Sequence, residues 1–184
     1  NIKYKTPIKE NTIYRIWSMT KPIVSIAIMQ LVENQKINLT DTIDKYINEF
    51  SDLKVLKNMN SEINELSEIK NLPTIKDLLM HTGGFTYHNY RAVGKDYLNK
   101  KLFFSQDTTL EEEINILSKI PLLYQPGTKW KYSVSTDILA RVLEVVINKP
   151  LQVILKENIF NPLKMNDTKF NVDEINTARV MKSY

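Results

Sequence analysis

Residues 18–32 read SMTKPIVSIAIMQLV and are the most informative stretch of this chain. The apolar part predicts a helix from Thr20 to about Asn34, with Pro22 in the first turn, where the missing N–H of proline costs no helical hydrogen bond. Because this helix is apolar on nearly all sides, we expect it to be central and buried. Ser18 would then lie at its buried N-terminal end.

Ser18 and Lys21 form an S-x-x-K motif at the start of this helix. Residues three apart lie on one face of a helix, so the hydroxyl and the amine would point into the same space. A serine hydroxyl becomes a good nucleophile when a neighbouring base takes its proton. Burial that lowers the pKa of Lys21 would leave part of it neutral for this task. For the motif on its own, a capping serine near a surface lysine is the alternative.

Other patterns predict a mostly helical chain with one or two strands. Alternation over residues 11–17 predicts a strand, residues 52–72 are polar connecting structure, and residues 87–106 are poorly patterned. Further helices are expected at residues 42–50, 75–80, 110–120, 135–148 and 150–159. We expect Ser135 or Thr136 to cap the fourth of these.

Composition narrows the classes of function. The 184 residues suit one domain or slightly more, with 42% hydrophobic and 25% charged residues, as in ordinary globular proteins. The net charge of +4 comes from scattered lysines without interleaved aromatics, so we expect no nucleic-acid partner. The chain has no cysteine and only two histidines, His81 and His88. Thiol chemistry is excluded, and we expect no metal and no cofactor.

No stretch of the sequence resembles a targeting signal or a membrane span. The chain opens on Asn1-Ile2-Lys3, without an apolar signal region. Its longest uncharged apolar run, residues 22–32, is far short of the roughly 20 residues that a span needs. We expect a bacterial protein of the cytoplasm or the periplasm, and the sequence leaves its oligomeric state open.

Three motifs follow one another along the chain. SMTK at residues 18–21 comes first, then LLMHTGGF at residues 78–85, then QPGTKWKYS at residues 125–133. Together they resemble the serine β-lactamase and penicillin-binding-protein superfamily on its class C side, and most of all its β-lactamase-like esterases. NPLKM at residues 161–165 strengthens this resemblance, which covers almost the whole chain.

The resemblance implies an α+β fold of the β-lactamase/transpeptidase type. This chain would hold its mostly α-helical part, with most of the antiparallel sheet missing. Residues 1–45 would be the N-terminal part of the α/β domain with the nucleophile helix. Residues 46–160 would form a mainly helical domain that carries the tyrosine motif, and residues 161–184 would return toward the α/β domain.

The resemblance also implies the roles of three residues. Ser18 is the nucleophile that becomes acylated, Lys21 is its partner, and Tyr132 matches the tyrosine across the site. A phenol has an ordinary pKa near 10, and a lysine ammonium beside it would lower that value. Lys21 and Tyr132 are therefore treated as a coupled pair that moves protons. His81 matches a loop that is structural in the family.

The chain departs from the family pattern in two ways. Val134 stands where class C enzymes and many penicillin-binding proteins have asparagine, and it cannot hydrogen-bond the amide of a lactam or peptide, which favours esters. The family's third motif, a K-T-G-like strand segment that supplies half of the oxyanion hole, does not occur before Tyr184. We therefore expect these 184 residues alone to be inactive or poorly soluble.

The function expected from these observations is that of a serine hydrolase acting through an acyl-enzyme. We expect a carboxylesterase, whose partner is a small-molecule ester or acyl substrate. The first alternative is a β-lactamase or D-alanyl-D-alanine carboxypeptidase. The second, of another class, is a non-catalytic β-lactamase-like protein that uses the cleft for binding.

Overall fold

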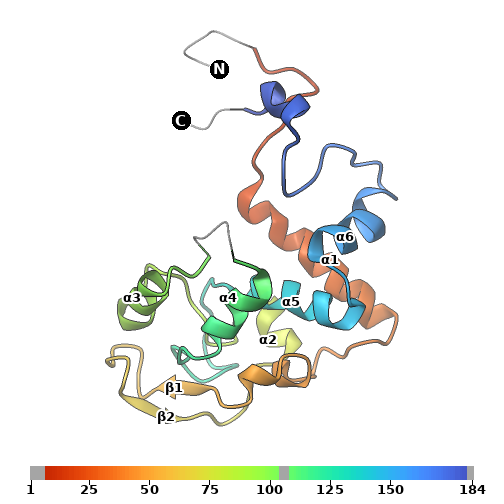
Figure 1. Cartoon of the computed structure of the whole chain (residues 1–184). Helices are drawn as coiled ribbons and strands as arrows, with labels where there is room; N and C mark the ends of the chain where they lie inside the picture. Colours follow the sequence, from red (N-terminus) through yellow and green to blue (C-terminus); the bar gives the residue numbers. More distant parts are fainter. Residues whose placement is uncertain (1–6, 104–107, 182–184) are drawn as a thin grey trace.

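The computed structural model describes residues 7–103 and 108–181, in which helices predominate (Figure 1). The α-helices are α1 (Thr20–Glu33), α2 (Ile75–Leu79), α3 (Arg91–Asn99), α4 (Leu110–Leu117), α5 (Ser135–Ile147) and α6 (Leu151–Leu155). Short 3-10 turns are η1 (Trp17–Met19), η2 (Ile43–Lys45), η3 (Asn48–Phe50) and η5 (Glu174–Arg179), and a π turn, η4 (Lys156–Phe160), extends α6. A small antiparallel sheet pairs β1 (Lys54–Leu56) with β2 (Leu66–Glu68). Over the described ranges, no helix has the length and apolar character needed to cross a membrane.

The helix α1 is the one that the apolar stretch predicts, with Pro22 in its first turn. Its buried residues are Val24, Ala27, Ile28 and Leu31. In contrast, Ile26 is 53% exposed and Met29 is 43% exposed, because the described elements that cover α1 are α5, α6 and η4, all on one side. Within the described residues α1 is therefore buried on one face only, and Ser18 at its start is exposed.

The helix α5 is the centre of the core. It packs against α1, α2, α4 and α6, and Figure 1 shows it in the middle of the molecule. Its fully buried apolar side chains are Ile138, Leu139, Val142 and Leu143. Burying each such side chain contributes about 1.5–3 kcal/mol, so the position of α5 is strongly determined by its apolar face.

The predicted cap of α5 is wrong, although the helix begins where it was expected. Its N-cap is Val134, and no side chain caps it. Neither Ser135 nor Thr136 can cap the helix, because both lie inside it. The hydroxyl of Ser135 instead shares a hydrogen bond of 2.7 Å with that of Ser133.

Two other predicted helices, α2 and α4, begin at reciprocal capping boxes. Thr74 accepts a hydrogen bond from the backbone N–H of Asp77, whose carboxylate accepts one from the N–H of Thr74. Thr109 and Glu112 make the same pair of bonds at the start of α4. Each box satisfies two backbone N–H groups that a helix start leaves without partners.

Three regions differ from the sequence prediction. Residues 52–72 contain the β1–β2 hairpin, in which Lys54 lies opposite Glu68 and forms an ion pair with it. The poorly patterned residues 87–106 contain α3. The helix expected over residues 42–50 is broken into the two turns η2 and η3.

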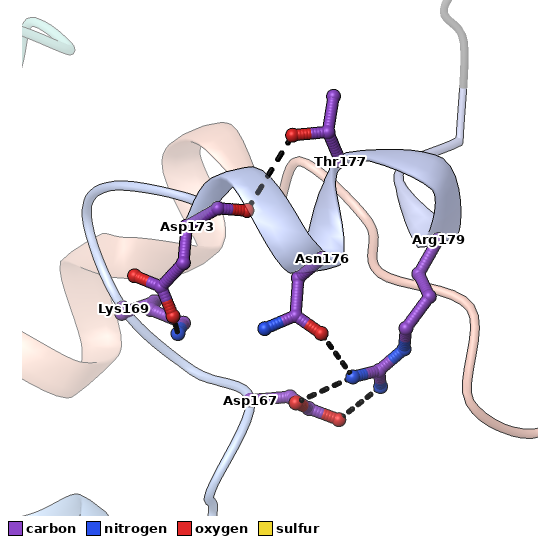
Figure 2. Close-up of polar contacts among 6 residues, drawn as sticks. All are labelled: Asp167, Lys169, Asp173, Asn176, Thr177 and Arg179. Atoms are coloured by element: carbon purple, nitrogen blue, oxygen red, sulfur yellow. Dashed lines mark hydrogen bonds and ion pairs between the residues drawn. The ribbon is translucent and has the colours of Figure 1, made fainter.

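The two ends of the described chain lie together (Figure 1). Ile13 and Val180 form a parallel bridge. Figure 2 shows the Arg179 guanidinium paired with Asp167, which fixes the turn η5 beside this bridge. Within the described residues the strand predicted over residues 11–17 is reduced to this bridge, because no longer strand lies beside it.

Candidate active site

Ser18 and Lys21 enter one cleft from the start of α1. Ser18 lies in the turn η1, and Lys21 is the second residue of α1, so about one helical turn separates them. The cleft has a volume of about 770 Å³ and is lined by residues of α1, the first turn of α4, α5 and α6. Ser18 is exposed there, and Lys21 is half-buried.

Tyr132 belongs to a segment without helix or strand that is held by the loop after α2. The N–H of Lys131 donates to the carbonyl oxygen of His81 at 3.0 Å. The N–H of Val134 donates to the carbonyl oxygen of Thr86 at 3.3 Å. The backbone is thus anchored on both sides of Tyr132.

The anchored segment brings Tyr132 to the two residues of the S-x-x-K motif. Lys21 Nζ lies 4.9 Å from the centroid of the Tyr132 ring. The Tyr132 hydroxyl lies close enough to Ser18 and Lys21 for both of them to lower its pKa. The structure therefore brings together all three residues that the sequence singled out.

The HTGG segment explains why the anchoring loop has this shape. Gly84 has a φ of +87°, and a Cβ built on it would lie 2.5 Å from the carbonyl oxygen of Tyr124, so a larger residue does not fit. The Gly84 carbonyl accepts from the N–H of Leu123, and the Thr82 carbonyl accepts from the N–H of Gly127. The second and third sequence motifs are therefore packed directly against each other.

The charge states of Lys21 and Tyr132 follow from their contact. Burial lowers the pKa of Lys21. The phenols of Tyr87 and Tyr132 raise this pKa by more than burial lowers it, so the net pKa is above its ordinary value. The expectation of a partly neutral Lys21 is wrong. Burial raises the pKa of Tyr132, but hydrogen bonds to Ser18 and Lys21 outweigh burial and lower it, as expected for a phenol beside an ammonium. Tyr132 is therefore the group of the pair that loses its proton first.

Tyr87 is a further member of the site, to which the sequence assigned no role. Its ring centroid lies 5.6 Å from Lys21 Nζ and 5.6 Å from the ring centroid of Tyr132. Burial raises the pKa of Tyr87 more than Lys21 lowers it, so this second phenol stays neutral. It lies at the start of the poorly patterned region, where no spacing connects it with Ser18.

Asp137 is a second residue that sequence reasoning missed. It lies in the first turn of α5 and lines the same cleft as Ser18 and Lys21. Burial raises the pKa of its carboxyl to about 6, although the positive charge of Lys21 lowers it in part. An acidic residue in the first turn of a helix is ordinary, so the sequence carried no signal for this placement.

Val134 does not line the cleft. Its side chain is fully buried and belongs to the hydrophobic core. The position therefore offers no hydrogen bond to a bound amide, in agreement with the departure seen in the sequence.

A family model described as beta-lactamase matches residues 1–184. The chain belongs to the beta-lactamase family. It has the β-lactamase/transpeptidase-like fold that the three motifs implied, and the two-stranded sheet of the described residues is consistent with a partial domain.

Relatives in this family include named hydrolases. The chain is 31% identical to esterase EstB of Burkholderia gladioli over 169 residues, 89% of this chain and 40% of EstB. It is 32% identical to a putative D-alanyl-D-alanine carboxypeptidase of Escherichia coli strain K12 over 178 residues, 93% of this chain and 37% of that protein. The solved structure of EstCE1, described as a hydrolase with promiscuous acyltransferase activity, matches with a TM-score of 0.82 and 25% identity, covering 98% of this chain and 45% of EstCE1. The chain thus spans less than half the length of these relatives.

Burial of Asp137 predicts a pH-dependent effect of Asp137→Asn on the free energy of unfolding. The folded pKa of about 6 is above the ordinary 3.8, so ionised Asp137 destabilises the fold. This cost grows between about pH 4 and pH 6 and stays constant above. The rise of this pKa corresponds to a loss of roughly 3 kcal/mol in the free energy of unfolding. We expect urea unfolding to show a more stable Asp137→Asn protein at pH 8, with little difference at pH 4.

The same substitution at the exposed residue Asp52 is the control. Asp52→Asn should leave the unfolding free energy at pH 8 within about 0.5 kcal/mol of the parent. Equal effects of Asp137→Asn at pH 4 and pH 8 would contradict the burial of the carboxyl.

Proposed function

We propose that this chain carries the nucleophile and the proton-transfer pair of a serine hydrolase that cleaves small carboxylic esters through an acyl-enzyme. One observation carries the proposal: the Lys21 ammonium lies against the Tyr132 ring, and Ser18 and Lys21 both lower the pKa of the Tyr132 hydroxyl. This arrangement supplies a base for a serine hydroxyl, which is what nucleophilic catalysis by serine requires.

The acylation step uses the three residues in turn. Tyr132, as the phenolate stabilised by Lys21, takes the proton of Ser18 Oγ while Oγ bonds to the ester carbonyl carbon. The backbone N–H of Ser18, at the helix start, stabilises the resulting oxyanion. The intermediate then expels the alcohol, to which Tyr132 returns the proton, and Ser18 is left acylated.

Deacylation uses the same pair in the same way. Tyr132 takes a proton from water, and the hydroxide attacks the acyl carbon. Collapse of the second intermediate releases the carboxylic acid and returns the proton to Ser18 Oγ. One base therefore serves both half-reactions.

Two observations favour esters over lactams and peptides. Val134 is buried and gives the cleft no amide with which to bind an acyl-amide side chain. The similarity to esterase EstB supports the same choice. The similarity to a putative D-alanyl-D-alanine carboxypeptidase keeps peptidase or lactamase activity as the second candidate.

A substrate panel tests this choice in the full-length protein. We expect p-nitrophenyl butyrate to be hydrolysed with a kcat/KM about 100-fold or more above that for a chromogenic cephalosporin or a D-alanyl-D-alanine peptide. The reverse order would support the second candidate. If the protein turns over none of these compounds and a fluorophosphonate does not label Ser18, a binding role replaces both.

A further inference from the structure

His81 makes side-chain contacts that go beyond the loop role expected for it. Its ring centroid lies 4.9 Å from that of Tyr132, with the planes at 46°. Its Nδ1 shares a hydrogen bond of 3.2 Å with the hydroxyl of Ser133, which in turn shares one of 2.7 Å with Ser135. Ser133 and Ser135 are buried, so this chain of hydrogen bonds ties the imidazole to the first turn of α5.

Tyr132 needs such a support. It lies outside helices and strands and is 39% exposed, so neither a regular element nor full burial fixes its side chain. Rotation about χ1 to another staggered position would carry the hydroxyl away from Ser18. The described rings beside it are those of His81 and Tyr87, and a misplacement of about 1 Å at a reacting group can cost about 100-fold in rate.

His81 is placed to support the base rather than to act as one. Its ring nitrogen Nδ1 shares a hydrogen bond with the buried hydroxyl of Ser133. Burial and the charge of Lys21 both lower the pKa of His81. A neutral imidazole against Tyr132 adds no second cation that would compete with Lys21 for the phenolate.

We propose that His81 is a positioning residue, which holds the Tyr132 ring so that its hydroxyl meets Ser18. The proposal rests on the proposed acyl-enzyme chemistry of Ser18. His81 acts at two points, through its ring against Tyr132 and through its carbonyl oxygen, which accepts from the N–H of Lys131. The bond to Ser133 keeps the ring in this orientation.

The substitution His81→Asn in the full-length protein tests the role of the ring. His81 has a φ of 56°, a left-handed conformation that asparagine tolerates better than most residues, so the loop should keep its shape. We expect kcat for p-nitrophenyl butyrate to fall about 10- to 100-fold, with KM within about twofold of the parent. The same change at the exposed residue His88 is the matched control and should leave both constants unchanged. A kcat within twofold of the parent, or an equal loss in His88→Asn, would overturn the proposal.

Ser133→Ala tests the route through the hydrogen bond. It should reproduce a large part of the kcat loss, and the double substitution should lose no more than His81→Asn alone. Losses that multiply in the double variant would contradict this route. A thermal unfolding curve of each variant excludes a general loss of folding.

The rate of Ser18 labelling by a fluorophosphonate separates this inference from the choice of substrate. Labelling requires the same proton transfer from Ser18 but no ester substrate. A protein that ignores esters, yet is labelled about 10-fold or more slowly in His81→Asn, would contradict the proposed substrate and support the role of His81. Equal labelling rates in parent and variant would contradict the role of His81.

Discussion

Ser18→Ala is expected to lower kcat/KM for p-nitrophenyl butyrate by about 10⁴-fold or more. The substitution removes the hydroxyl that is proposed to form the acyl bond, while the apolar face of α1 stays intact. The measurement is initial-rate hydrolysis in the full-length protein, together with mass spectrometry of the acylated form. The mass of the acyl group should be found on Ser18 in the parent and be missing from the variant.

Ser25→Ala is the matched control for this experiment. Ser25 lies further along α1 and does not line the cleft. We expect Ser25→Ala to keep kcat/KM within about twofold of the parent. Unchanged turnover in Ser18→Ala, or an acyl group carried by another residue, would refute the assignment of the nucleophile.

Tyr132→Phe is expected to produce the second largest effect, a loss of about 10²–10⁴-fold in kcat with KM nearly unchanged. Phenylalanine keeps the ring contacts with Lys21, Tyr87 and His81 but removes the hydroxyl that is proposed to take the proton of Ser18. Steady-state kinetics measure the loss, and a thermal unfolding curve close to that of the parent would show that packing is preserved.

The phenol of Tyr87 provides the comparison. Its pKa is raised, so it stays protonated, and Tyr87→Phe should reduce kcat by no more than about 10-fold. Equal losses in the two variants would contradict the assignment of Tyr132 as the base. A pH profile adds a second check, because the activity of the parent should rise as Tyr132 loses its proton, whereas Tyr132→Phe should lack this rise.

The sequence predicted those helices whose stabilising features lie close together along the chain. The apolar run of α1 and the capping boxes at Thr74 and Thr109 are local features, and these helices begin where they were expected. The β1–β2 hairpin and α3 were missed. Val55 is buried because it forms bridges to both Ser67 and Leu122, and no local pattern reports a partner 67 positions away.

The residues of the candidate site also differ in whether a local pattern could identify them. Ser18, Lys21 and Tyr132 could be singled out because each belongs to a short motif with a characteristic spacing. Asp137 and His81 could not be assigned a role in this way. Asp137 lines the cleft because α5 packs against α1. The ring of His81 meets Tyr132 because residues 81–84 pack against residues 122–131.

The sequence by itself determined the family and predicted the nucleophile and the pair proposed to move protons, since all three depend on residue types at characteristic spacings. The tertiary structure decided the direction in which the pKa of each member of the pair shifts. Burial alone would have favoured a neutral Lys21, but the two phenols of Tyr87 and Tyr132 raise its pKa, and Lys21 in turn lowers the pKa of Tyr132. A pKa depends on the charges and hydrogen bonds that surround a group in space, and those neighbours are set by packing between segments more than 60 residues apart.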